Sequence, residues 1–67
     1  MENLILNMIE NLTKRKNFEI HQIEEFKQKK LHDLILITSG KIMELENIIQ
    51  NLSELIEYNA HLNNNHL

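Results

Sequence analysis

Apolar side chains recur at strict seven-residue intervals in the second half of the chain. Isoleucine stands at positions 35, 42, 49 and 56, and a second row at 31, 38, 45, 52 and 59 falls between them. Heptad rows with isoleucine at a and leucine at most d positions are typical of coiled-coil helices. The pattern therefore predicts a long helix whose central seam consists of Ile42, Leu45, Ile49, Leu52 and Ile56.

A third apolar row widens this stripe beyond that of a two-stranded coiled coil. Leucine or isoleucine stands at 34, 48, 55 and 62, where a simple dimer would carry charge, and only Lys41 interrupts the row. A stripe that takes three positions in seven suits a helix with more than one neighbour. The row therefore favours a multi-helix bundle.

The first half of the chain is also helical in its periodicity, but its rows are out of phase with those of the second half. A second apolar face, at 20, 23, 26, 31 and 34, follows the first one. Between them, residues 13–17 combine three cations with an asparagine, as helix ends often do. The sequence leaves open whether the helix breaks there. The first face consists of Leu4, Ile5, Met8, Ile9 and Leu12.

Gly40 is the only glycine and stands between apolar residues on both sides. A lone glycine costs a helix about 1 kcal/mol, which is too little to end it. However, Ser39 is a good N-cap, and residues 34–37 are apolar in every helical direction. We therefore expect a helical hairpin that turns near Ser39-Gly40, with arms at 18–38 and 41–62, rather than one straight coiled coil.

Such a hairpin leaves the face of residues 4–12 uncovered, because the second arm ends near the level of residue 18. Either residues 1–16 fold back as a third helix, or they continue the first arm and a second chain covers them. In both cases the fold is all-α, with one domain at 1–62 and a disordered asparagine-rich tail at 63–67. A dimeric bundle is favoured, since 67 residues without cysteine form only a small core.

The inventory of reactive side chains is thin. Without cysteine the chain forms neither disulfides nor thiolate metal sites, and its four histidines lack the Glu-x-x-His spacing of helical di-iron proteins. Serine occurs only at 39 and 53, and there is no glycine-rich phosphate loop. We therefore expect no enzymatic activity, no cofactor and no metal.

The cellular location is also predicted from patterns that the sequence lacks. The absence of cysteine fits a reducing compartment. The N-terminus lacks a signal-peptide pattern, and the longest apolar run is far below the ~20 residues that span a bilayer. We expect a cytoplasmic protein without a transmembrane segment.

The apolar faces indicate a protein that binds other proteins. The net charge is −3, yet residues 14–30 hold six cations and three glutamates. This basic stretch makes an RNA- or DNA-binding hairpin dimer the alternative, although net acidity and three aromatic residues argue against it. We predict a small non-enzymatic helical interaction module, a self-associating regulator or adaptor that docks on another protein. The seam would be its central interface, and the N-terminal face would be a second interface or a partner-binding face.

Overall fold

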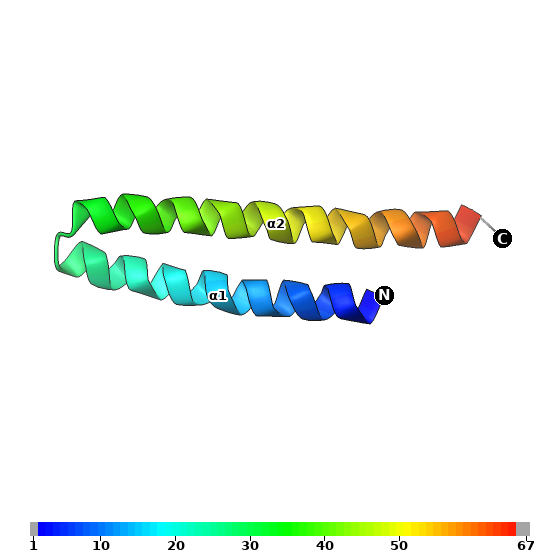
Figure 1. Cartoon of the computed structure of the whole chain (residues 1–67), viewed down its shortest axis with the longest axis horizontal. Coiled ribbons are helices and arrows are strands. Elements are labelled where there is room, and N and C mark those ends of the chain that lie inside the picture. Colours follow the sequence, from blue (N-terminus) through cyan, green and yellow to red (C-terminus); the bar gives the residue numbers. More distant parts are fainter. Residues whose placement is uncertain (1, 66–67) are drawn as a thin grey trace.

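The chain folds into two long antiparallel helices joined by a short turn (Figure 1). The computed structural model describes residues 2–65, and the side chains of residues 2–62. Helix α1 spans Glu2–Gln28 and helix α2 spans His32–Asn65. The prediction of an all-α helical hairpin is therefore confirmed. The molecule measures 57 × 16 × 11 Å, so it is a rod rather than a globule.

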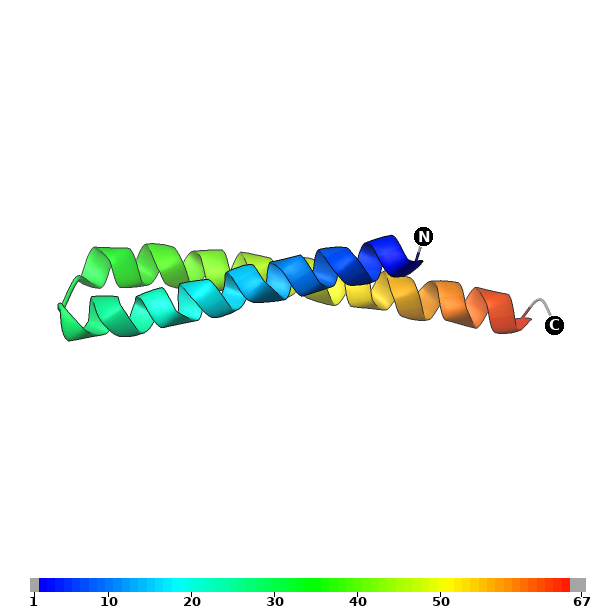
Figure 2. The ribbon, with the colours of Figure 1, turned by 90° about the horizontal axis from the view of Figure 1, so that it is seen from below.

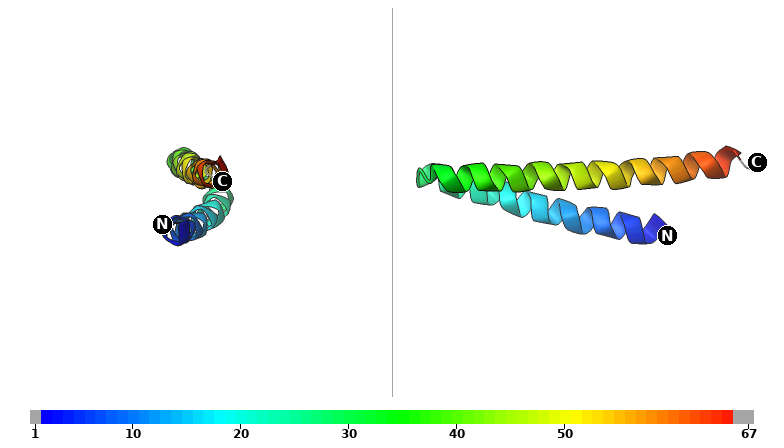
Figure 3. Two further views of the ribbon diagram at one scale, coloured as in Figure 1. Left: turned by 90° about the vertical axis from the view of Figure 1, so that its right-hand side faces the viewer. Right: turned by 45° about the horizontal axis from the view of Figure 1, so that its top comes forward.

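The two helices cross each other near the middle of the rod (Figure 2). They are closest where the turn joins them and separate toward the other end, where the chain begins and ends (Figure 3). Helix α2 continues past the start of α1 (Figure 1). We call the two ends of the rod the turn end and the open end.

The turn is a Schellman motif built without glycine or proline. The N–H of Leu31 donates to the carbonyl of Phe26 at 2.9 Å, and the N–H of Lys30 donates to that of Lys27 at 3.2 Å. Lys30 has the left-handed conformation that the motif requires, with φ of 58°. The carbonyl of Leu31 then accepts the N–H of Ile35 at 3.1 Å, so α2 starts directly after the turn.

Charged residues around the turn complement the dipoles of both helices. Lys27 lies in the last turn of α1, and Lys29 and Lys30 follow it, next to the partial negative charge at the helix C-terminus. Asp33 lies in the first turn of α2, at the positive end of that helix. These four side chains stabilise a helix stop and a helix start within a few residues.

Replacing Lys30 with glycine should raise the free energy of unfolding by about 1 kcal/mol. A side chain in the left-handed region costs roughly 1–2 kcal/mol, and glycine removes that strain at the expense of some unfolded-state entropy. Thermal melts at one fixed protein concentration measure the change. The control is Lys29→Gly, since Lys29 has no positive φ and should lose stability. A loss with Lys30→Gly as well would contradict the described turn.

The predicted turn at Ser39-Gly40 is wrong, because both residues lie inside α2. The heptad rows pass through Gly40 without a change of phase, and the seam offsets the ~1 kcal/mol that a helical glycine costs. Packing does not require glycine there, since an added Cβ would meet nothing within 4 Å. Leu36 and Ile37, which a turn at Gly40 would have sheltered, are exposed.

The position of the turn changes the predicted arms as well. The arms at 18–38 and 41–62 are misplaced, and residues 2–28 form one helix that does not break at 13–17. Residues 2–16 therefore form no third helix and continue into the first arm. The tail predicted at 63–67 begins too early, because residues 63–65 continue α2, while His66 and Leu67 lie outside the described residues.

A single seam between the helices forms the core. Inward-facing residues alternate at intervals of three and four in both helices, as in a coiled coil. Counting outward from the turn places Phe26 level with Ile35, and Ile5 level with Ile56. The α1 side of the seam consists of Ile5, Ile9, Leu12, Lys16, Glu19, Ile23 and Phe26. The α2 side consists of Ile35, Thr38, Ile42, Leu45, Ile49, Leu52, Ile56 and Asn59.

Candidate interaction surface

The five residues predicted to form the central seam all lie on the side of α2 that faces α1. Leu45 is buried, with 6% of its surface exposed, and Ile42, Ile49, Leu52 and Ile56 are half-buried. Within one chain these side chains hold the hairpin together. These side chains are therefore used within the hairpin, so a partner protein would dock on other residues.

The predicted N-terminal face is divided by the structure. Ile5, Ile9 and Leu12 lie in the seam, where α2 covers them, and Ile5 is 6% exposed. Leu4 and Met8 point away from the seam and are exposed. The uncovered face expected from a turn at Gly40 is thus reduced to two residues.

The continuation of the α1 seam beyond Leu12 is not predicted by the apolar pattern of the sequence. The spacing of three and four that begins at Ile5 continues to Phe26, but charged residues stand at two consecutive seam positions. Lys16 lies level with Leu45 and Glu19 level with Ile42, and both charged side chains are half-buried. The long aliphatic stem of Lys16, and to a smaller extent the methylenes of Glu19, can cover apolar neighbours while the charges reach water.

Exposed large apolar side chains are unevenly divided between the two broad sides of the hairpin. The two rows of positions nearest the seam on one side hold nine of the fourteen exposed large apolar residues. We call this surface the apolar side. It consists of Leu4, Met8, Phe18, Leu34, Ile37, Ile48, Leu55, Tyr58 and Leu62. The opposite side holds only Leu6, Ile20, Leu36 and Met43, and Leu31 lies in the turn.

A small cavity of about 180 Å³ lies halfway along the apolar side. Its lining brings Arg15 and Glu19 of α1 together with Lys41 and Glu44 of α2. Leu45 and Ile48 complete the lining. Two cations and two carboxylates therefore form a charge-balanced cluster between the apolar residues of the open end and those of the turn end. We call it the central charged cluster.

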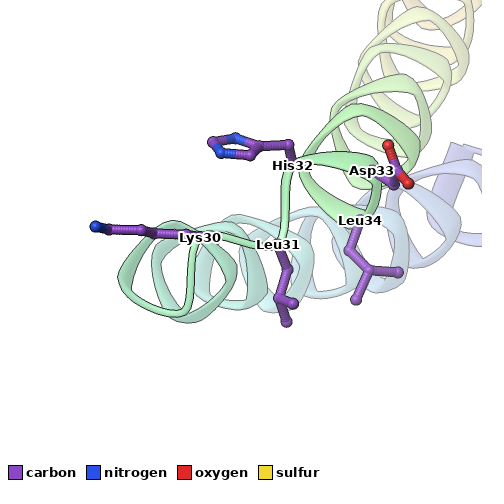
Figure 4. Close-up of a pocket in the computed structure, with 5 residues that line it drawn as sticks. All are labelled: Lys30, Leu31, His32, Asp33 and Leu34. Atoms are coloured by element: carbon purple, nitrogen blue, oxygen red, sulfur yellow. The ribbon is translucent and has the colours of Figure 1, made fainter.

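The larger cavity, about 560 Å³, is a shallow hollow at the turn. It is lined by five consecutive residues, 30–34. Lys30 and His32 point away from the hairpin, whereas Leu31 and Leu34 lie together on another side (Figure 4). A catalytic site needs several groups that converge on one point, and the side chains at this hollow diverge.

The basic stretch of α1 is interspersed with carboxylates that pair with it. Lys14 lies 3.4 Å from Glu10, and Lys27 lies 3.7 Å from Glu24. Both pairs are solvent-exposed and lie within α1, so each contributes at most about 0.5 kcal/mol to stability. Two of the six cations between residues 14 and 30 are thus paired with carboxylates.

Comparison with known proteins adds no relative. No family model, curated protein or solved structure matches this chain. Within the described residues, histidines and carboxylates do not gather in the groups of three that a metal ion needs. Neither helix, over its described length, is long and apolar enough to cross a membrane. The apolar side and the charges around it are therefore the features of this chain that indicate a function.

Proposed function

We propose that this chain is a non-enzymatic helical interaction module, a self-associating regulator or adaptor that also docks on another protein. It would act by burying exposed apolar side chains against a second protein surface, which contributes about 25 cal/mol per Å² of apolar area before the entropic cost of association is subtracted. The proposal keeps the cytoplasmic location expected from the absence of cysteine.

The observation that supports this function is the distribution of apolar side chains. Ile5 and Leu45 are the only buried apolar residues among those described, whereas fourteen large apolar residues are exposed. Monomeric soluble proteins rarely expose contiguous apolar patches of more than a few hundred Å². A hairpin with so few buried and so many exposed apolar side chains gains stability when it buries part of this surface against a partner.

The alternative function is nucleic-acid binding at the turn end. All seven Lys and Arg residues lie between positions 14 and 45, in the half of the rod that contains the turn. Against this function, five acidic residues share the same half, and two of the lysines pair with glutamates. A phosphate-binding face would show affinity that falls steeply with salt.

Self-association can be tested by thermal melts over a range of protein concentrations. We expect the melting temperature of the full chain to rise with concentration, because association stabilises the folded state by mass action. Light scattering should give a mass above the 8.0 kDa of one chain. A monomer that melts cooperatively at one temperature throughout the micromolar range would overturn the proposed self-association. Addition of RNA that stabilises the chain only at low salt would favour the alternative.

A further inference from the structure

We propose that the apolar side is the interface of a homodimer in which two hairpins pack antiparallel, with the turn end of one copy beside the open end of the other. The inference rests on the self-association proposed above and adds the surface and the orientation. The product is a four-helix bundle. Three features indicate that a second copy of this chain covers the apolar side. They are the exposed area, the charge polarity and the position of the central charged cluster.

The exposed area of the hairpin exceeds that of a compact protein by the amount that one interface buries. A folded monomer of 8.0 kDa is expected to expose about 4,400 Å². This chain exposes 5496 Å². The excess of roughly 1,000 Å² is close to the ~800 Å² that each partner buries in a stable complex. One face of the rod, covered once by a surface of the same length, would remove the excess.

The charge polarity of the rod favours a second copy in the opposite orientation. The turn half, residues 14–45, holds seven cations and five carboxylates, a net charge of +2. The open half, residues 2–13 and 46–65, holds five carboxylates and no lysine or arginine, a net charge of −5. An antiparallel pair places unlike halves side by side, whereas a parallel pair places both strongly acidic halves together. Such complementarity fixes orientation.

The central charged cluster lies where the two-fold axis of such a dimer must pass. Lys16 and Leu45 are level with each other and about halfway between the turn and the open end. The cluster of Arg15, Glu19, Lys41 and Glu44 surrounds this point. At a two-fold axis the same residues meet their own copies. Two cations and two carboxylates can pair with an identical set, whereas a single sign of charge would repel.

The apolar residues are then covered from both ends. The open end contributes Leu4, Met8, Leu55 and Tyr58, and the turn end contributes Phe18, Leu34 and Ile37. Rotation about an axis across the rod, through the level of Leu45, brings Leu55 of one copy next to Leu34 of the other. Leu4 and Met8 come level with the turn half of the second α1. Rotation also sets α1 against the second α1, and α2 against the second α2. The apolar third row of α2 thereby gains the second neighbour that its width requires.

The surface is tested with two matched substitutions in α2. Leu55→Glu changes the apolar side, where Leu55 is 44% exposed, and Leu36→Glu changes the opposite side, where Leu36 is 73% exposed. Both are surface changes in the single hairpin. We expect sedimentation equilibrium to show a dissociation constant at least about tenfold higher for Leu55→Glu, and unchanged for Leu36→Glu. Retained helicity, measured by circular dichroism, shows that each variant still folds.

The orientation is tested with single cysteines, because the chain has none of its own. Gln22 lies toward the turn from Lys16, and Asn11 lies about as far toward the open end. An antiparallel dimer brings Gln22 of one copy level with Asn11 of the other. Identical cysteines would lie roughly 15–18 Å apart, beyond the ~7 Å limit between disulfide-linked Cα atoms. We expect mixed Gln22→Cys and Asn11→Cys chains to cross-link and each variant alone to stay reduced.

The negative results of these experiments distinguish an error in the surface, in the orientation and in the dimer itself. An equal effect of Leu36→Glu and Leu55→Glu, or no effect of either on a dimeric protein, would overturn the surface and leave the self-association. Cross-linking of Gln22→Cys alone, or none in the mixture, would overturn the antiparallel orientation. A native chain that stays monomeric would overturn the dimer and the proposed self-association together.

Discussion

Replacing Leu45 with aspartate should unfold the hairpin. Leu45 is the most deeply buried apolar residue of α2, and its truncation alone would cost about 2–5 kcal/mol. Aspartate adds a carboxylate without a buried partner. A chain of this size has only about 3–5 kcal/mol of net stability, so the loss exceeds what the fold can absorb. Circular dichroism at room temperature should show loss of most of the helical signal.

The matched control for this substitution is Met43→Asp. Met43 lies two residues away in the same helix, and its side chain is exposed on the opposite side of the hairpin. We expect this variant to keep its helicity, with a change within about 0.5 kcal/mol. If Leu45→Asp remained as helical as Met43→Asp, the seam would not be the source of stability.

Replacing both charged seam residues of α1 with leucine should raise the free energy of unfolding by about 2–3 kcal/mol. Lys16 and Glu19 are half-buried, and each leucine would add apolar contact with α2 worth roughly 1–1.5 kcal/mol, about half of full burial. Lys16→Leu/Glu19→Leu would complete an unbroken apolar row from Ile5 to Phe26. Chemical denaturation at a fixed protein concentration measures the gain.

The control for the added hydrophobicity is Lys14→Leu, on the solvent-facing surface of α1. Its ion pair with Glu10 is exposed, so its loss should change stability by less than about 0.5 kcal/mol. A decrease in stability of Lys16→Leu/Glu19→Leu would mean that Glu19 and its neighbours in the central charged cluster contribute more than burial does. That outcome would identify the cluster as a structural element.

The helical character of both arms could be predicted from the sequence because it depends on local spacing. The a and d rows of α2 are nearly continuous, so the seam-facing side of this helix is readable without knowledge of the partner. In α1 the same reasoning stopped at Leu12. Lys16 and Glu19 stand where the spacing predicts the next two apolar residues, so the sequence alone indicates a separate second face that includes Ile23.

The position of the turn could not be predicted from the only glycine, Gly40, because the chain has a lysine, Lys30, at the left-handed position of the turn. The expected signal, cations at the end of a helix, was present twice. It occurs at residues 13–17, where the helix continues, and at Lys27, Lys29 and Lys30, where α1 ends. The two stretches differ in the lengths of the helices that a turn there would create. Only a turn at Lys30 places each apolar row of α1 opposite an apolar row of α2.

The separation of the helices toward the open end has a consequence for the order of folding. Phe26 and Ile35 can meet after closing only a short loop, whereas Ile5 and Ile56 close nearly the whole chain, at a larger entropic cost. The hairpin should therefore zip from the turn, and its free ends should be the last to join and the first to fray. Local opening of the hairpin should therefore begin at the open end and reach the seam next to the turn last.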